Sequence, residues 1–98
     1  MVTNDFDNTP IRSAVPQDHV IFTDFDGREG MLVDLNTRKY YQLNETAALV
    51  WRGIEKFETI ENIAKELNTL YDVPVDRAAF SVQRLLRSFN AYKLIRLT

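Results

Sequence analysis

The chain has 98 residues, of which 45% are hydrophobic and 27% charged, and its formal net charge is −2. These values are typical of one small folded domain and leave little room for a deep, walled active site. The absence of cysteine excludes disulfides, thiolate metal sites and cysteine nucleophiles. The acidic balance also disfavours sequence-independent binding of nucleic acid, which needs a basic surface to neutralise phosphates.

The first residues are polar and follow no sustained period, so we expect residues 1–16 to be a flexible segment and residues 17–98 to be the folded domain. No apolar run approaches the ~18 residues of a membrane helix, and the acidic start does not resemble a signal peptide. We therefore expect a cytoplasmic protein that does not bind membranes.

Three short segments predict β-strands. Residues 19–25 (HVIFTDF), 30–35 (GMLVDL) and 39–43 (KYYQL) are rich in β-branched and aromatic residues. Asp26-Gly27 is a strong turn signal between the first two, and a polar turn separates the last two. Because such short links cannot cross over to a parallel strand, the strands form an antiparallel meander.

Three helices are expected after the strands. Asn44 is a good N-cap for the first helix and Gly53 a candidate for its end, while Thr59 caps the second. The third opens near Asp76. Residues 94–97 (LIRL) fit a terminal strand or a helix tail. Apolar residues at helical spacing predict the buried faces: Ala47, Ala48, Trp51 and Ile54, then Ile60, Ile63, Ala64, Leu67 and Leu70, then Val75, Ala78, Ala79, Val82, Leu85, Leu86 and Phe89.

Strands followed by helices indicate an α+β fold. The string in residues 30–51, GMLVDLNTRKYYQLNETAALVW, resembles the PqqD family (pyrroloquinoline quinone biosynthesis protein D), and the likeness extends over roughly residues 17–97. The resemblance implies a winged-helix-like domain, a RiPP recognition element that binds the leader of a ribosomally made precursor peptide. Residues 52–56 depart from a Leu-Cys-Asp-Gly stretch common in the quinone pathway, which leaves the pathway open.

In that family the leader adds as an extra strand to the third strand, in a groove shared with the third helix. This binding mode is physically reasonable, because an edge strand exposes unpaired backbone groups and neighbouring side chains supply selectivity. Arginines and an aromatic beside the edge would suit an acidic, amphipathic leader. The candidate peptide-binding residues are Lys39, Tyr40, Tyr41 and Gln42 on the strand and Arg77, Phe80, Ser81, Arg84, Arg87 and Ser88 on the helix. Which face of the strand is buried stays open.

No constellation of residues predicts catalysis, a metal or a cofactor. Asp24 and Asp26 flank a glycine turn and are better read as turn formers, and the single histidine, His19, lacks the partners of a zinc or triad site. The expected partners are the precursor peptide and a modifying enzyme, either a radical SAM protein or a leader peptidase with its cyclase. We expect a monomer or weak homodimer.

Two other functions remain open. A winged-helix DNA-binding protein could use Arg77, Arg84 and Arg87 on phosphates, although the net charge and the sheet preceding all helices disfavour it. A subunit that stabilises or regulates a larger enzyme without touching the peptide is the other alternative.

Overall fold

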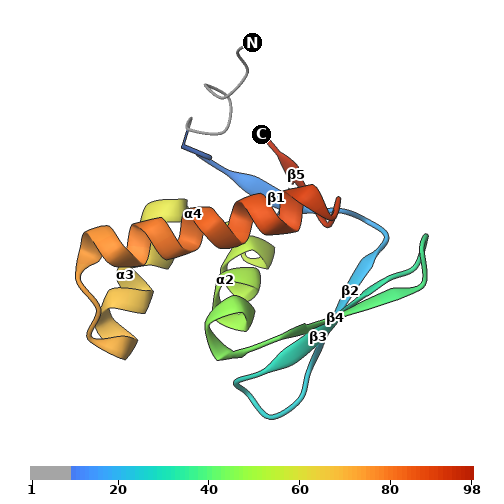
Figure 1. Cartoon of the computed structure of the whole chain (residues 1–98), viewed down its shortest axis with the longest axis horizontal. Helices are drawn as coiled ribbons and strands as arrows, with labels where there is room; N and C mark the ends of the chain where they lie inside the picture. The colour runs from blue at the N-terminus through green and yellow to red at the C-terminus, as the bar shows by residue number, and fades with distance from the viewer. Residues whose placement is uncertain (1–9) are drawn as a thin grey trace.

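The computed structural model describes residues 10–98 and has an α+β fold, with a three-stranded antiparallel sheet followed by three helices (Figure 1). This confirms the predicted fold class. The elements are β1 (Ala14–Pro16), β2 (Val20–Asp24), β3 (Gly30–Asp34), β4 (Lys39–Leu43), α2 (Glu45–Glu55), α3 (Ile60–Tyr71), α4 (Val75–Ala91) and β5 (Ile95–Leu97). None of these helices is long and apolar enough to cross a membrane.

The sheet has the order β2–β3–β4, so the predicted meander is confirmed. Strand alternation gives it two different faces. In the inner row Phe22 lies opposite Leu32, which lies opposite Tyr41, and Leu32 is fully buried. In the outer row the strand β4 contributes Tyr40, whose side chain is 67% exposed. The inner face therefore rests on the helices, and the outer face points to solvent.

The two ends of the described chain pair with each other. β1 and β5 form a separate antiparallel ribbon in which Val15 lies opposite Arg96 (Figure 1). The terminal LIRL segment is thus a strand, and Ala14 is buried beneath it. Ordered structure begins before the expected boundary at residue 17, while residues 1–9 lie outside the described residues.

Local capping starts the first two helices. Asn44 Oδ1 accepts a hydrogen bond from Ala47 N at 2.9 Å, and Thr59 Oγ1 accepts one from Asn62 N at 3.1 Å. The prediction that Gly53 ends the first helix is wrong, because α2 continues to Glu55. Gly53 is buried, and a Cβ there would lie 2.7 Å from Ile63 Cγ1, so it permits the close approach of α2 and α3.

The predicted helical faces are largely buried, with two errors. Leu70 and Val75 are 61% and 57% exposed. Both lie where α3 passes into α4, and Leu70 borders an open depression instead of the closed core. In the centre of the core, the rings of Trp51 and Phe89 meet edge to face, with centroids 5.3 Å apart.

Candidate functional site

The outer margin of β4 is the feature around which the candidate site is built. β4 pairs with β3 on one side, and no other strand among residues 10–98 pairs with it on the other. The terminal strands β1 and β5, which could have covered this margin, pair with each other instead. Within residues 10–98, the β4 edge of the sheet is therefore open.

The hydrogen-bond pattern shows which backbone groups face that margin. Leu35 N donates to His19 O at 2.8 Å and Phe25 N donates to Glu29 O at 3.0 Å. Because bonding alternates along antiparallel strands, the odd-numbered residues of β3 bond β2 and the even-numbered ones bond β4. On β4 the backbone groups of Tyr40 and Gln42 consequently point outward, away from β3.

A depression of about 320 Å³ lies beside this margin, where the start of α2 faces α4. Asn44 and Thr46 line one wall, and the α4 wall is lined by Ser81, Arg84, Leu85 and Ser88. Arg84 is the one charged group in this lining, and its guanidinium carbon lies 6.0 Å from the centre of the Phe80 ring. The depression thus combines small polar groups with one cation and an adjacent aromatic.

Tyr41 connects the strand to the far end of α4. Its ring is half-buried on the inner face, and its centroid lies 5.1 Å from that of Tyr92, the residue that follows α4. The inner face of β4 is therefore the buried one, which the sequence left open. Tyr92 was missed by the sequence analysis, since a tyrosine after a helix carries no local signal of a contact some fifty residues away.

The predicted residues do not all come together. Ser81, Arg84 and Ser88 line the depression, and Arg77 is exposed one turn before Ser81. Phe80 is 60% exposed and stands beside Arg84 instead of packing on the sheet. On β4, Lys39 and Gln42 are exposed, Tyr40 faces outward and Tyr41 inward. The geometry also adds Asn44, Thr46 and Leu85.

Arg87 occupies a different flank of α4. Successive helical residues are about 100° apart, so Arg87 is turned away from Ser88 and follows Gln83 by one turn. Gln83 Nε2 donates to Ile11 O at 2.9 Å, and Ile11 N donates to Gln83 Oε1 at 2.8 Å. That flank carries the N-terminal strand segment, so Arg87 does not line the depression beside β4.

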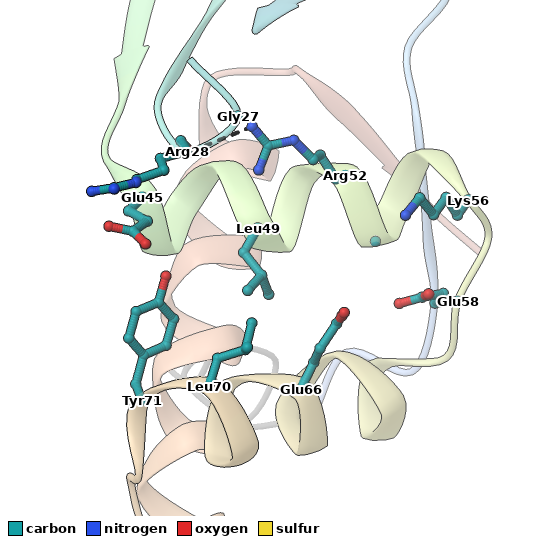
Figure 2. Close-up of a pocket in the computed structure, with 11 residues that line it drawn as sticks. Gly27, Arg28, Glu45, Leu49, Arg52, Lys56, Glu58, Glu66, Leu70 and Tyr71 are labelled. Atoms are coloured by element: carbon teal, nitrogen blue, oxygen red, sulfur yellow. Dashed lines mark hydrogen bonds between the residues drawn. The ribbon is translucent and has the colours of Figure 1, made fainter. Parts of the chain in front are cut away.

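A third region, between α2, α3 and the β2–β3 turn, forms a depression of about 220 Å³ (Figure 2). Leu49 and Leu70 face each other across it, and Arg52 Nη2 donates to Arg28 O at 3.4 Å. The Tyr71 hydroxyl points toward Glu45; burial and then this carboxylate raise the pKa of Tyr71. The acidic and basic residues that line this depression are equal in number, and none of the lining residues belongs to β4 or α4.

The acidic residues at the β2–β3 turn serve the turn itself. Asp24 Oδ1 accepts from Gly27 N at 2.7 Å and Asp26 Oδ1 accepts from Glu29 N at 3.1 Å. The N–H groups of Glu29 and Arg28 lower the pKa of Asp26. Within the described part of the chain, no three His, Cys, Asp or Glu side chains gather closely enough to hold a metal ion.

Asp34 organises the turn before β4. Its side chain is buried and accepts hydrogen bonds from Asn36 N at 2.9 Å and Thr37 N at 3.2 Å. Burial alone would raise the pKa of Asp34, but these two bonds and the nearby His19 outweigh it, so the pKa is lowered. His19 Nε2 lies 3.8 Å from Asp34 Oδ1. The histidine therefore supports a structural carboxylate.

Comparison with known proteins decides the family. The profile described as coenzyme PQQ synthesis protein D (PqqD) matches residues 29–95, which include β3, β4 and all three helices. The chain belongs to the PqqD family. No curated protein sequence matched the chain.

Two solved structures share the fold of this PqqD-family chain. One is TbiB1 in complex with the TbiA(beta) leader peptide, with a TM-score of 0.79 at 22% identity, covering 84% of this chain and 94% of that one. The other is lasso peptide synthetase B1 complexed with the leader peptide, with a TM-score of 0.78 at 21% identity, covering 86% of this chain and 98% of that one.

Proposed function

We propose that this chain binds the leader of a ribosomally made precursor peptide as a fourth strand on β4, beside α4. The observation that carries the proposal is the open margin of β4 among the described residues. An extended peptide can satisfy the outward N–H and C=O groups of Tyr40 and Gln42, and such main-chain bonds supply affinity with little sequence preference.

The side chains beside that margin would add selectivity. Ser81 and Ser88 offer hydroxyl groups, and Arg84 offers a guanidinium that pairs with a carboxylate in a fork geometry. Tyr41 and Tyr92 present aromatic surface farther along the strand. A bound peptide would therefore be extended, with apolar and acidic side chains directed toward α4.

The chain itself would act as a non-catalytic adaptor in the cytoplasm. Its candidate site consists of backbone groups, hydroxyls, aromatic rings and an arginine, which suit binding better than acid–base or nucleophilic chemistry. The chemistry would belong to a partner that takes over the bound precursor, either a radical SAM enzyme or a leader peptidase with its cyclase. Two proteins of the same fold were solved in complex with leader peptides, which supports the proposed binding role.

A proline substitution tests the strand addition directly. Gln42→Pro removes an outward N–H group without touching the β3–β4 ladder, and edge strands tolerate proline. Fluorescence anisotropy with the labelled leader of a precursor encoded beside the gene should show more than about a tenfold loss of affinity. Gln42→Ala, which removes the side chain and keeps the N–H, should bind within about twofold of the wild type.

The controls separate folding from binding. The far-UV circular dichroism and thermal midpoint of the proline variant should stay close to those of the wild type, because Gln42 is exposed. Equal affinity of the proline variant and the wild type would refute strand addition at β4. A lack of saturable binding to the wild type itself would refute the leader-binding function.

A further inference from the structure

A further depression of about 520 Å³ lies between the turn that precedes β4 and the end of α4. Asn36 and Thr37, in the turn before β4, line one side, and Tyr92 and Lys93, after α4, line the other. Tyr92 also contacts Tyr41, so this residue stands at the junction between the depression and the inner face of β4. A chain bound along β4 would therefore reach this space on leaving the strand.

The depression has unbalanced positive charge. Lys93 and Arg96 line it, and its one carboxylate, Asp34, is already bonded by the N–H groups of Asn36 and Thr37. Only 3% of the Asp34 side chain is exposed, so it is not available to neutralise the two cations. Within residues 10–98 neither cation forms an ion pair, although Arg96 also borders a depression lined by Asp18 and Glu55, and two such cations in one depression favour an anionic ligand.

Backbone geometry holds Lys93 at the rim of the depression. Lys93 has a left-handed conformation with φ of 60°. The turn is closed by Lys93 N donating to Asn90 O and Leu94 N donating to Phe89 O, both at 2.9 Å. Such a closed turn is a common way to end a helix, and it fixes where the lysine side chain starts.

We propose that this depression is a second subsite, which binds a carboxylate of the bound peptide beyond the segment paired with β4. The inference rests on the proposed function. Because the whole sheet is antiparallel, an added strand runs antiparallel to β4. The peptide then enters beside Leu43 and Arg84 and continues in its C-terminal direction past Thr37 to Lys93.

The separation of the two cationic ends sets a spacing rule for the peptide. β4 runs from Lys39 to Leu43, and an extended chain rises about 3.4 Å per residue. Side chains on one face recur every second residue, so the spacing is even. The subsites therefore select Asp or Glu at two positions roughly four residues apart, with an apolar residue between them facing Tyr41 and Tyr92.

Selection from a displayed library of random peptides, each about 12 residues long, tests this rule. The wild-type chain should enrich acidic residues at both positions. The double variant Lys93→Gln/Arg96→Gln should lose the enrichment at the C-terminal position only and bind the wild-type-selected peptide about tenfold more weakly. Arg28→Gln/Lys65→Gln, with the same charge change elsewhere, should stay within about twofold of the wild type.

A charge-swapped variant distinguishes loss of the subsite from loss of folding. Lys93→Glu/Arg96→Glu should enrich Lys or Arg at the C-terminal position, a gain that an unfolded chain does not produce. Enrichment of a single acidic position by the wild type, or an unchanged second position in the charge-swapped variant, would overturn the second subsite. Enrichment of no sequence at all by the wild type would instead refute the proposed peptide binding, and the subsite with it.

Discussion

The two edges of the three-stranded sheet differ in how far the protein already occupies them. On β2, Val20 N donates to Gln17 O at 3.2 Å, and the side chains of Asp24 and Phe22 contact Arg52 of α2. On β4, the outward backbone groups of Tyr40 and Gln42 form no hydrogen bond within residues 10–98. β2 and β4 are both outer strands of the sheet, so an outer position alone does not make an edge available for pairing.

The two edges therefore differ in the features that discourage or permit pairing with another chain. A free sheet edge invites pairing with other chains, and proteins usually blunt such edges with charges or covering elements. β2 is blunted at its start by a bonded loop and carries an ion pair on its side chains, whereas β4 lies open beside the depression that Arg84 lines. This contrast supports the proposal that the β4 edge binds the peptide.

The largest expected effect is in amide exchange along β4. The amides of Tyr41 and Leu43 bond β3 and should be protected, whereas those of Tyr40 and Gln42 should exchange at least about a hundredfold faster in the free protein. Hydrogen exchange followed by NMR measures this, and added leader should slow both outward amides. Protection of Tyr40 above Tyr41 in the free protein would invert the deduced bonding pattern.

The turn that leads into β4 should depend on the charge of Asp34. Its pKa is lowered in the folded state, so its stabilising contribution is present above its ordinary value of 3.8 and is lost as the pH falls through the folded value. Asp34→Asn should have a lower thermal midpoint than the wild type at pH 7. The difference should shrink below pH 3.8 in a series of melts, and a constant difference would contradict the assignment.

The two flanks of α4 should respond differently to loss of an arginine. Arg84→Gln should weaken leader binding about threefold, because an exposed charge pair contributes modestly. Arg87→Gln removes the same charge on the flank that faces the N-terminal segment and should leave affinity within about 1.5-fold. Isothermal titration of both variants measures this. Equal losses would mean that the peptide covers both flanks.

The smallest effect is expected at the blunted edge. Arg52→Gln removes the 3.2 Å contact with Asp24 and the guanidinium over the Phe22 ring, 5.4 Å from its centre. Both partners are partly exposed, so the loss in stability should be about 1 kcal/mol or less, measured by urea unfolding. Peptide affinity should not change. A stronger dimerisation of the variant would show that β2 can also pair once uncovered.

Much of the fold could be predicted because its signals are local. The bounds of β4 follow from alternation and turn residues, and the starts of α2 and α3 follow from the caps Asn44 and Thr59. The pairing of β1 with β5 could not be predicted, because it joins Ala14 to Leu97, near opposite ends of the sequence. The burial errors at Leu70 and Val75 have the same origin, since helical spacing does not reveal where a neighbour ends.

The candidate site was predicted in part for a related reason. Ser81, Arg84 and Ser88 recur at helical spacing and line one depression, whereas Arg87, which the sequence analysis grouped with them, does not line it. The side of a helix that faces solvent is wide, and only the three-dimensional arrangement divides it into flanks. Tyr92 belongs to the candidate site because its ring contacts that of Tyr41, a contact that no local sequence pattern predicts.

The ribbon of β1 and β5 also suggests that the chain can be circularly permuted. Thr98 N donates to Ser13 O at 3.2 Å, so the two ends of the described part of the chain, residues 10–98, lie side by side. Domains with adjacent ends tolerate rejoining and reopening elsewhere. A circular permutant opened between Asp26 and Gly27 would keep β4 and α4 on one uninterrupted stretch, placing new attachment points beside the blunted edge for tethering an enzyme or a reporter.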